Sequence, residues 1–169
     1  MTIRYASSAR DPSVQPITPT PAQNSQGDLK ALQSNVQLPV GATVADRDVF
    51  GRIPTNAKIE PGSKLWNGAL TGLTSYDVGL FAETAPFTPD YTQGAAACLI
   101  SAKDIHLASS QDFSALITPD KGGKSAWELA GLTSDPGGFL CVVGTIHAAG
   151  GTATASDWLD LHLHYRRPE

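Results

Sequence analysis

Two histidines close to the end of the sequence have the spacing that best suits a metal ion. His162 and His164 lie two positions apart, so on a β-strand both side chains project from the same face. A zinc site needs at least a third protein ligand. Asp160, His106 and His147 are the candidates, but no spacing places any of them beside the pair. We therefore interpret the two histidines as solvent-facing or interface residues and predict no metal site.

The other candidate sites for chemistry lack part of the pattern that each chemistry requires. Gly122-Gly123-Lys124-Ser125 matches the end of a phosphate-binding loop, but the full pattern requires glycine where the chain has Thr118. Asp46 and Asp48 flank Arg47, and we interpret them as a solvated turn or strand edge because a calcium site needs about six oxygen ligands. No G-x-S-x-G elbow or Cys–His signature is present. We predict no catalytic residues, no cofactor and no enzyme activity.

Three tryptophans could act through their rings, because aromatic side chains stack on sugar rings and fill subunit contacts. Trp66, Trp127 and Trp158 would bind a glycan only if they lined one groove, and the sequence does not fix their mutual placement. Core packing or subunit contact is the simpler interpretation. Glycan recognition is the alternative.

The two cysteines lie far apart in the sequence. Cys98 and Cys141 have no CxxC partner, which argues against zinc binding and against a thioredoxin-like motif. We predict two buried free thiols, and a disulfide between them is the alternative.

The composition limits the class of protein that carries these residues. A chain of 169 residues fits one domain, and 41% hydrophobic with 17% charged residues is enough to fill a core. Sixteen glycines and twelve prolines favour turns over long helices. The net charge of −4 argues against direct nucleic-acid binding. Without an apolar run of about 18 residues or a secretory signal, we expect a protein made in the cytoplasm with no membrane partner.

The first 27 residues differ from the rest of the chain. They carry four prolines among Ser, Thr and Gln, and their few apolar residues show no period. We predict an extended arm over residues 1–27 and a folded domain over residues 28–169. A tail with no role is the alternative interpretation. Against it, the arm contains residues suited to binding a partner, which are Ile3, Arg4, Tyr5, Val14 and Ile17.

Short strands separated by turns dominate the remaining sequence. We expect strands over 44–53, 57–59, 63–66, 73–82, 113–117, 139–143 and 158–165, a loop over 84–94, and one or two helical turns over 95–102. The strand over 73–82 alternates with a period of two, so one of its faces should look inward. The strand over 139–143 is apolar throughout, which suits burial on both faces. The strand over 158–165 should place its leucines in the core.

This arrangement predicts an all-β protein. Residues 29–36 fit a helix and a strand equally well, and that segment stays open. Seven or eight short strands without a repeat of fixed length are typical of a β-sandwich, in which two sheets enclose one core.

Four runs of the sequence resemble small virion proteins of tailed bacteriophages. They are residues 48–59 (DVFGRIPTNAKI), 75–80 (SYDVGL), 127–132 (WELAGL) and 161–165 (LHLHY). The resemblance extends loosely over residues 46–165. It implies a single jelly-roll-like β-sandwich that serves as a non-enzymatic head decoration, or cement, protein on the outside of the capsid. The implied partners are the major capsid protein and other copies of the same chain, in a trimer.

In such a protein the arm over residues 1–27 would cross the seam between capsid subunits and add to a sheet edge or groove there. The alternative implied by the resemblance is a tail or fibre component that binds host surface glycans through exposed aromatic residues.

Overall fold

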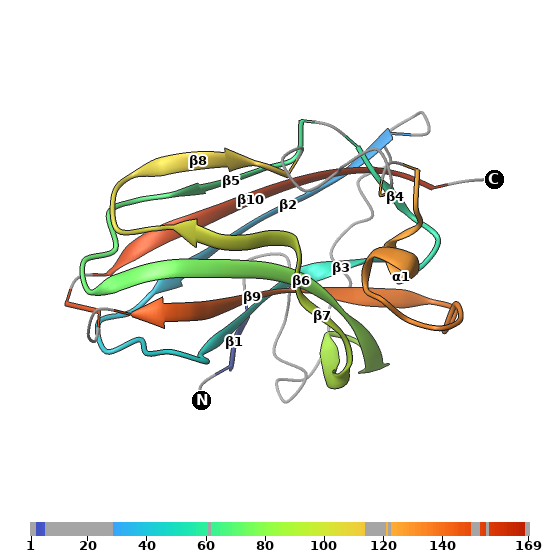
Figure 1. Cartoon of the computed structure of the whole chain (residues 1–169), viewed down its shortest axis with the longest axis horizontal. Helices are drawn as coiled ribbons and strands as arrows, with labels where there is room; N and C mark the ends of the chain where they lie inside the picture. Colours follow the sequence, from blue (N-terminus) through green and yellow to red (C-terminus); the bar gives the residue numbers. More distant parts are fainter. Residues whose placement is uncertain are drawn as a thin grey trace.

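The computed structural model describes residues 3–5, 29–60, 62–113, 121, 123–149, 153–154 and 156–167. These residues form ten strands and one short helix (Figure 1). The elements are β1 (Ile3–Tyr5), β2 (Leu29–Leu38), β3 (Arg47–Pro54), β4 (Lys58–Ile59), β5 (Lys64–Asn67), β6 (Leu73–Ala85), β7 (Thr88–Asp104), β8 (Ser109–Asp112), α1 (Ala126–Leu129), β9 (Phe139–Ala149) and β10 (Asp157–Arg166). No helix in these ranges is long and apolar enough to cross a membrane.

Eight of the strands pair as one long hairpin that is wrapped up on itself. β6 and β7 form its tip, and β5 with β8, β3 with β9 and β2 with β10 follow along its two arms, each pair antiparallel. Successive pairs alternate between two sheets. Sheet 1 has the order β1-β3-β9-β6-β7, and sheet 2 has the order β2-β10-β5-β8 with β4 also beside β10 (Figure 1). This is the jelly-roll topology, so the predicted all-β sandwich is confirmed.

The core lies between the two sheets and is built by alternation along the central strands. On β10, Leu159, Leu161 and Leu163 are buried, which confirms the predicted leucine face. Across the core, the inward side chains of β6 include Tyr76 and Leu80, and they belong to the same apolar cluster. Burying one such side chain is worth about 1.5–3 kcal/mol, so this ladder of alternating residues supplies much of the stability.

One face of β6 looks into the core, as predicted, and the other face of the strand is buried as well. Asp77, Gly79 and Phe81 project away from the core and are nevertheless buried. The reason is the path of β7. Between the pairs Val78↔Ile100 and Leu80↔Ala95, β6 advances by two residues while β7 advances by five.

A second irregularity follows immediately along the same pair of strands. Between Phe81↔Gly94 and Ala82↔Asp90, β6 advances by one residue while β7 advances by four. Bulges of this kind bend a strand and increase its twist. The end of the β6–β7 hairpin therefore curls (Figure 1), and extra residues of β7 lie over the outer face of sheet 1.

The helical turns expected over 95–102 and the loop expected over 84–94 were both wrong, because these residues belong to the β6–β7 hairpin. Alanine favours helix by less than about 1 kcal/mol per residue, and burial of Leu99 and Ile100 against β6 outweighs that preference. Pro89 is tolerated within β7 because β7 is the edge strand of sheet 1.

Other segments were predicted with partial success. Residues 29–36, for which a helix and a strand were equally possible, lie in strand β2. The apolar run over 139–143 lies in strand β9, and its Leu140 and Cys141 are buried on opposite faces, as predicted. The strand expected over 113–117 falls largely on residues outside the described ranges. β8 lies immediately before it, in a polar sequence that carries no apolar period.

The beginning of the chain pairs with the domain. β1 lies parallel to the first residues of β3, with Ile3 opposite Arg47 and Tyr5 opposite Val49. At residues 3–5, therefore, the arm does not extend away from its own domain as predicted. Without β1, the N–H and C=O groups at this edge of β3 would lack a strand partner, and pairing with β1 satisfies them.

We predict that Gly79→Ala destabilises the fold. A Cβ atom at this position would lie 2.0 Å from the carbonyl oxygen of Ala95, so β7 would have to move away from β6. We expect a loss of about 1–3 kcal/mol in the free energy of unfolding, measured by urea denaturation. Gly137→Ala is the control: its Cβ would meet open space, and only the strain of a positive φ remains. Unchanged stability of Gly79→Ala would contradict the close packing of the two strands.

Candidate functional site

The structure places three of the five predicted partner-binding residues. Ile3, Arg4 and Tyr5 form β1, at the edge of sheet 1. Val14 and Ile17 lie outside the described residues. The role of all five in binding a partner stays a prediction.

The candidate metal ligands are not brought together. His162 and His164 share the outer face of β10, as predicted, but Nδ1 of His147 is 2.8 Å from Oδ2 of Asp77 on sheet 1. His106 follows β7, and its N–H donates to Asp104. Across the described residues, no group of three His, Cys, Asp or Glu side chains is placed to hold a metal ion.

The interpretation of Asp46 and Asp48 as solvated residues was wrong, because both are buried. Asp46 accepts a hydrogen bond from the N–H of Thr43 and closes the turn before β3. Asp48 projects into the core side of β3 and accepts a hydrogen bond from the Tyr76 hydroxyl. These carboxylates are structural polar groups, since a buried charge requires such partners.

The outer face of sheet 2 carries exposed aromatic and polar side chains from four neighbouring strands. In one row Asn35, Asp160, Trp66 and Ser110 are successive partners across the sheet. Paired residues of antiparallel strands project from the same face, so the rows form one surface. We call it the tryptophan face, and it consists of Gln33, Asn35, Gln37, Lys64, Trp66, Ser110, Asp112, Trp158, Asp160, His162 and His164.

Two indole rings are the main apolar groups on the tryptophan face. Trp66 is 38% exposed and Trp158 is 49% exposed, so core packing is the wrong interpretation for both. The His162 ring contacts the Trp66 ring edge to face, with centroids 4.7 Å apart. This contact restricts the Trp66 side chain before any partner binds. Trp127 belongs to α1 and packs against the core, so the three tryptophans do not line one groove.

The polar groups of the tryptophan face are suited to hydrogen bonding more than to charge attraction. Gln33, Asn35 and Gln37 are exposed amides along β2. Nζ of Lys64 lies 3.2 Å from a carboxylate oxygen of Asp112, so these two charges compensate each other. The carboxylate of Asp160, which is the pairing partner of Trp66, is the further charge on this face. Exposed tryptophan rings beside amides and few charges are typical of protein interfaces, whose centres are depleted of charged residues.

Part of the outer face of sheet 1 is covered by the chain itself. A second apolar cluster forms there from Val49, Phe81, Cys141 and Val143, with Phe87 and Tyr91 of the hairpin packed against it. The Arg47 guanidinium lies 3.7 Å from the centroid of the Tyr91 ring. Such a cation–π contact adds to the apolar attraction. Among the described residues, the tryptophan face is therefore the less covered of the two outer faces.

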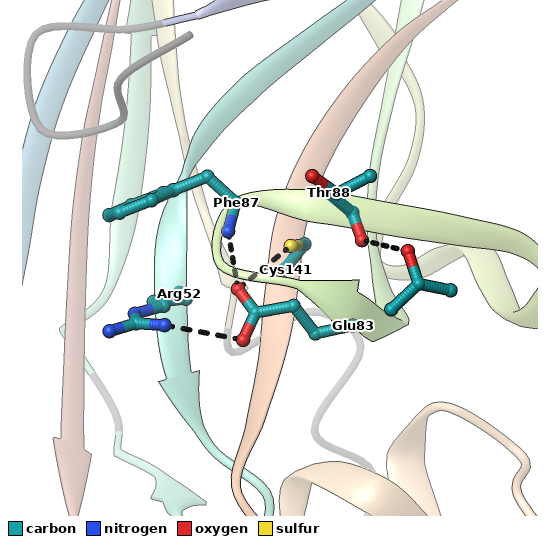
Figure 2. A network of polar contacts seen from close by, with 6 residues as sticks. Arg52, Glu83, Phe87, Thr88 and Cys141 are labelled. Atoms are coloured by element: carbon teal, nitrogen blue, oxygen red, sulfur yellow. Dashed lines mark hydrogen bonds and ion pairs between the residues drawn. The ribbon is translucent and has the colours of Figure 1, made fainter. Parts of the chain in front are cut away.

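A partly buried carboxylate holds the hairpin tip in place (Figure 2). Glu83 lies 3.3 Å from Nη1 of Arg52 and accepts hydrogen bonds from the Phe87 N–H at 2.6 Å and from the Cys141 thiol at 3.6 Å. Phe87 has a φ of +60°, which is unfavourable for a residue with a side chain. The Glu83 hydrogen bond stabilises this turn. The Arg52 guanidinium also lies over the rings of Phe87 and Phe139.

Both cysteines are free thiols, as predicted. Cys141 is buried, whereas Cys98 is only partly buried by exposed area. Burial raises the pKa of Cys98 to about 12, and burial together with the negative charge of Glu83 raises the pKa of Cys141. A raised pKa keeps a thiol protonated and chemically inert at neutral pH.

Sequence patterns gave no sign of a polar network that joins the two sheets. Nζ of the buried Lys103 donates to the Ser109 hydroxyl, which donates to the side-chain carbonyl of Asn67. The Asn67 amide in turn donates to the backbone carbonyls of Ile105 and Leu107. Burial lowers the pKa of Lys103. This network fixes the crossing from β7 in sheet 1 to β8 in sheet 2.

We predict that Glu83→Ala releases the hairpin tip and exposes Cys141. The change removes the acceptor for Arg52 and the Phe87 N–H, at a cost of about 1–3 kcal/mol in stability. Iodoacetamide labelling at pH 8, located by peptide mass spectrometry, should modify Cys141 faster in the variant. In the wild type Cys98 should react about a thousandfold more slowly than in the unfolded chain, because a pKa near 12 leaves little thiolate.

Glu60→Ala is the matched control for this experiment. It removes an ion pair with Arg166 that involves no hairpin residue, so Cys141 should stay protected. Equal labelling of Cys141 in the Glu83→Ala and wild-type proteins would show that Glu83 does not hold the tip.

The fold is similar to that of two chains from solved virus particles. One belongs to the capsid of Ralstonia phage GP4: it aligns with 99% of this chain and 99% of its own length, with a TM-score of 0.67 and 18% identity. The other belongs to the capsid asymmetric unit of cyanophage Pam1, with 94% of this chain and 100% of that chain covered, a TM-score of 0.53 and 15% identity. No protein-family profile matches the sequence, and no curated protein matches it.

At these identities the similarity is one of fold. Because nearly the whole length of each chain is aligned, it extends to the complete jelly roll and is not limited to one sheet. The two neighbouring chains are accordingly close to this one in size.

Proposed function

We propose that this protein is a structural component of a bacteriophage capsid, and specifically a decoration protein on the outside of the head. The observation that carries the proposal is the end-to-end fold similarity to a chain from the capsid of Ralstonia phage GP4. The second capsid chain, from cyanophage Pam1, supports the same assignment independently. The sequence runs that resemble small virion proteins also support it, since they lie within the aligned domain.

The tryptophan face is the proposed contact with the major capsid protein. It is the outer face of a sheet, and it presents two exposed indole rings among amides, the Lys64–Asp112 ion pair and the carboxylate of Asp160. Aromatic side chains of this kind supply most of the binding energy in many protein interfaces. The net charge of −4 is consistent with attachment outside the shell, away from packaged DNA.

Attachment would stabilise the shell by linkage. A molecule that binds only the expanded lattice of a mature head lowers the free energy of that state by its own binding free energy. Packaged DNA presses outward on the shell, so stabilisation of this state resists rupture. If several copies are joined as a trimer, avidity turns weak single contacts into firm attachment.

The second candidate function is a tail or fibre component that binds host glycans. The observation that favours it is the exposure of Trp66 and Trp158 beside the amides of β2, because indole rings stack on sugars while amides bind hydroxyl groups. Mass spectrometry of purified particles separates the candidates. Hundreds of copies per particle indicate decoration of the head, whereas a handful indicate the tail.

We predict that Trp66→Ala together with Trp158→Ala weakens attachment to capsids without unfolding the protein. Hot-spot aromatic residues contribute about 2 kcal/mol or more each, so the affinity should fall by about 30-fold for one ring and by up to about 1,000-fold for both, in co-sedimentation with capsids that lack this protein. Leu107→Ala is the control, since Leu107 is 66% exposed but lies outside the tryptophan face. Unchanged affinity of the double variant would exclude the tryptophan face as the contact, and glycan-array binding lost in the same variant would favour the tail.

We also predict that removal of residues 1–27 leaves a folded domain with weaker attachment. The described core is built from residues of β2 onward, so circular dichroism should still report a β-protein. The deletion removes all five predicted partner-binding residues and the β1 strand. Co-sedimentation measures the loss of affinity, and full-strength binding by the truncated protein would refute a role for the arm.

A further inference from the structure

β1 stands apart from the wrapped hairpin that forms the rest of the sandwich. It pairs in parallel with β3, whereas every other strand pairing in the described residues is antiparallel. It lies at the edge of sheet 1, so no further strand depends on it for its own pairing. β1 can therefore leave the sheet while all the other pairs stay formed.

The contact that holds β1 is short. Three residues, Ile3 to Tyr5, pair with Arg47 to Val49, and β3 is paired along its whole length on its other side with β9. A ladder of three residues offers few hydrogen bonds, each worth about 0.5–1.5 kcal/mol net. Opening of the β1–β3 edge thus costs much less than unfolding of the domain, as is usual for terminal segments.

The part of β3 that pairs with β1, Arg47 to Val49, is held in position by other residues of the domain. Asp48 and Val49 are buried, and Asp48 is held by the Tyr76 hydroxyl of β6. On the outer side the Arg47 guanidinium lies over the Tyr91 ring of β7. The main-chain edge of β3 is therefore held in position from both faces of the sheet, independently of which strand pairs with it.

The connection between β1 and β2 is long enough to reach another molecule. Residues 6–28 separate the two strands, which is 23 residues. Fully extended, a segment of that length spans at most about 80 Å. A domain of about 140 residues has a radius of gyration of only about 14 Å. The length of the connection permits pairing within one molecule and pairing with a neighbour.

We propose that β1 is exchanged between copies of this chain, so that Ile3–Tyr5 of one molecule pairs with Arg47–Val49 of a neighbour. The exchanged pairing has the same register and the same hydrogen bonds as the internal one, so the balance depends on concentration. A covalent connection of this length gives an effective concentration of the order of millimolar. Exchange is then a minor state in dilute solution and becomes a major state where copies are crowded on a surface. This inference does not rest on the capsid role, because exchange is a property of the isolated protein.

Disulfide trapping tests the proposal on the full-length chain. Ile3 and Arg47 are direct partners, so one chain carrying both Ile3→Cys and Arg47→Cys should form an internal disulfide at low concentration. Next, a tagged chain with Ile3→Cys is mixed with an untagged chain with Arg47→Cys and oxidised. At about 0.1 mM, we expect about a tenth of the chains to be exchanged and a covalent heterodimer that increases with concentration.

Thr71→Cys replaces Arg47→Cys in the control mixture, since Thr71 is exposed and has no pairing with β1. We expect the Arg47→Cys mixture to give several-fold more heterodimer than this control, and oxidised wild type to give none. Equal yields in the two mixtures at every concentration, with the internal disulfide intact, would overturn the exchange. Absence of the internal disulfide would also overturn it, because the β1–β3 register itself would be wrong.

Discussion

The nested antiparallel pairing of eight strands is the constraint on which the rest of this structure depends. Each pair closes a longer segment than the previous one, from the tight β6–β7 turn to β2 and β10 at opposite ends of the domain. Because successive pairs alternate between sheets, β10 and β6 both become interior strands and bring their apolar faces together. The pairing also gives each sheet an outer face, and the two outer faces differ in how far other parts of the chain cover them.

The path of β7 decides what those outer faces can do. Its two largest bulges bend the hairpin over sheet 1, where Phe87 and Tyr91 cover a second apolar cluster and Glu83 fixes the tip. Sheet 2 has no such cover in the described residues, and Trp66 and Trp158 stay exposed on it. The asymmetry is thus built by local geometry: Gly79 lets the backbone of β7 approach, and a side chain there would prevent it.

The sequence predicts the parts of this fold that follow from strict alternation and misses those that depend on contact between distant strands. The leucines of β10 and the continuous apolar run of β9 carry their own signal, and both strands were predicted. β8 has the polar sequence SSQD and gives no such signal. The bulged part of β7 contains three consecutive alanines, and their weak helical preference is overcome only because β6 is there to pair with them. For the same reason, the sequence identifies Trp66 and Trp158 as binding candidates and cannot show that one sheet face is left open.

The two proposed contacts use different parts of the molecule and therefore do not compete. β1 lies at an edge of sheet 1, where main-chain hydrogen bonds recognise any strand of suitable shape, and the tryptophan face belongs to sheet 2. An edge contact adds little specificity, whereas side chains on a face distinguish one partner from another. A molecule that binds a shell through its face could exchange β1 with the next molecule at the same time. Each link would then raise the local concentration for the other, which is how contacts that are weak singly hold a lattice together.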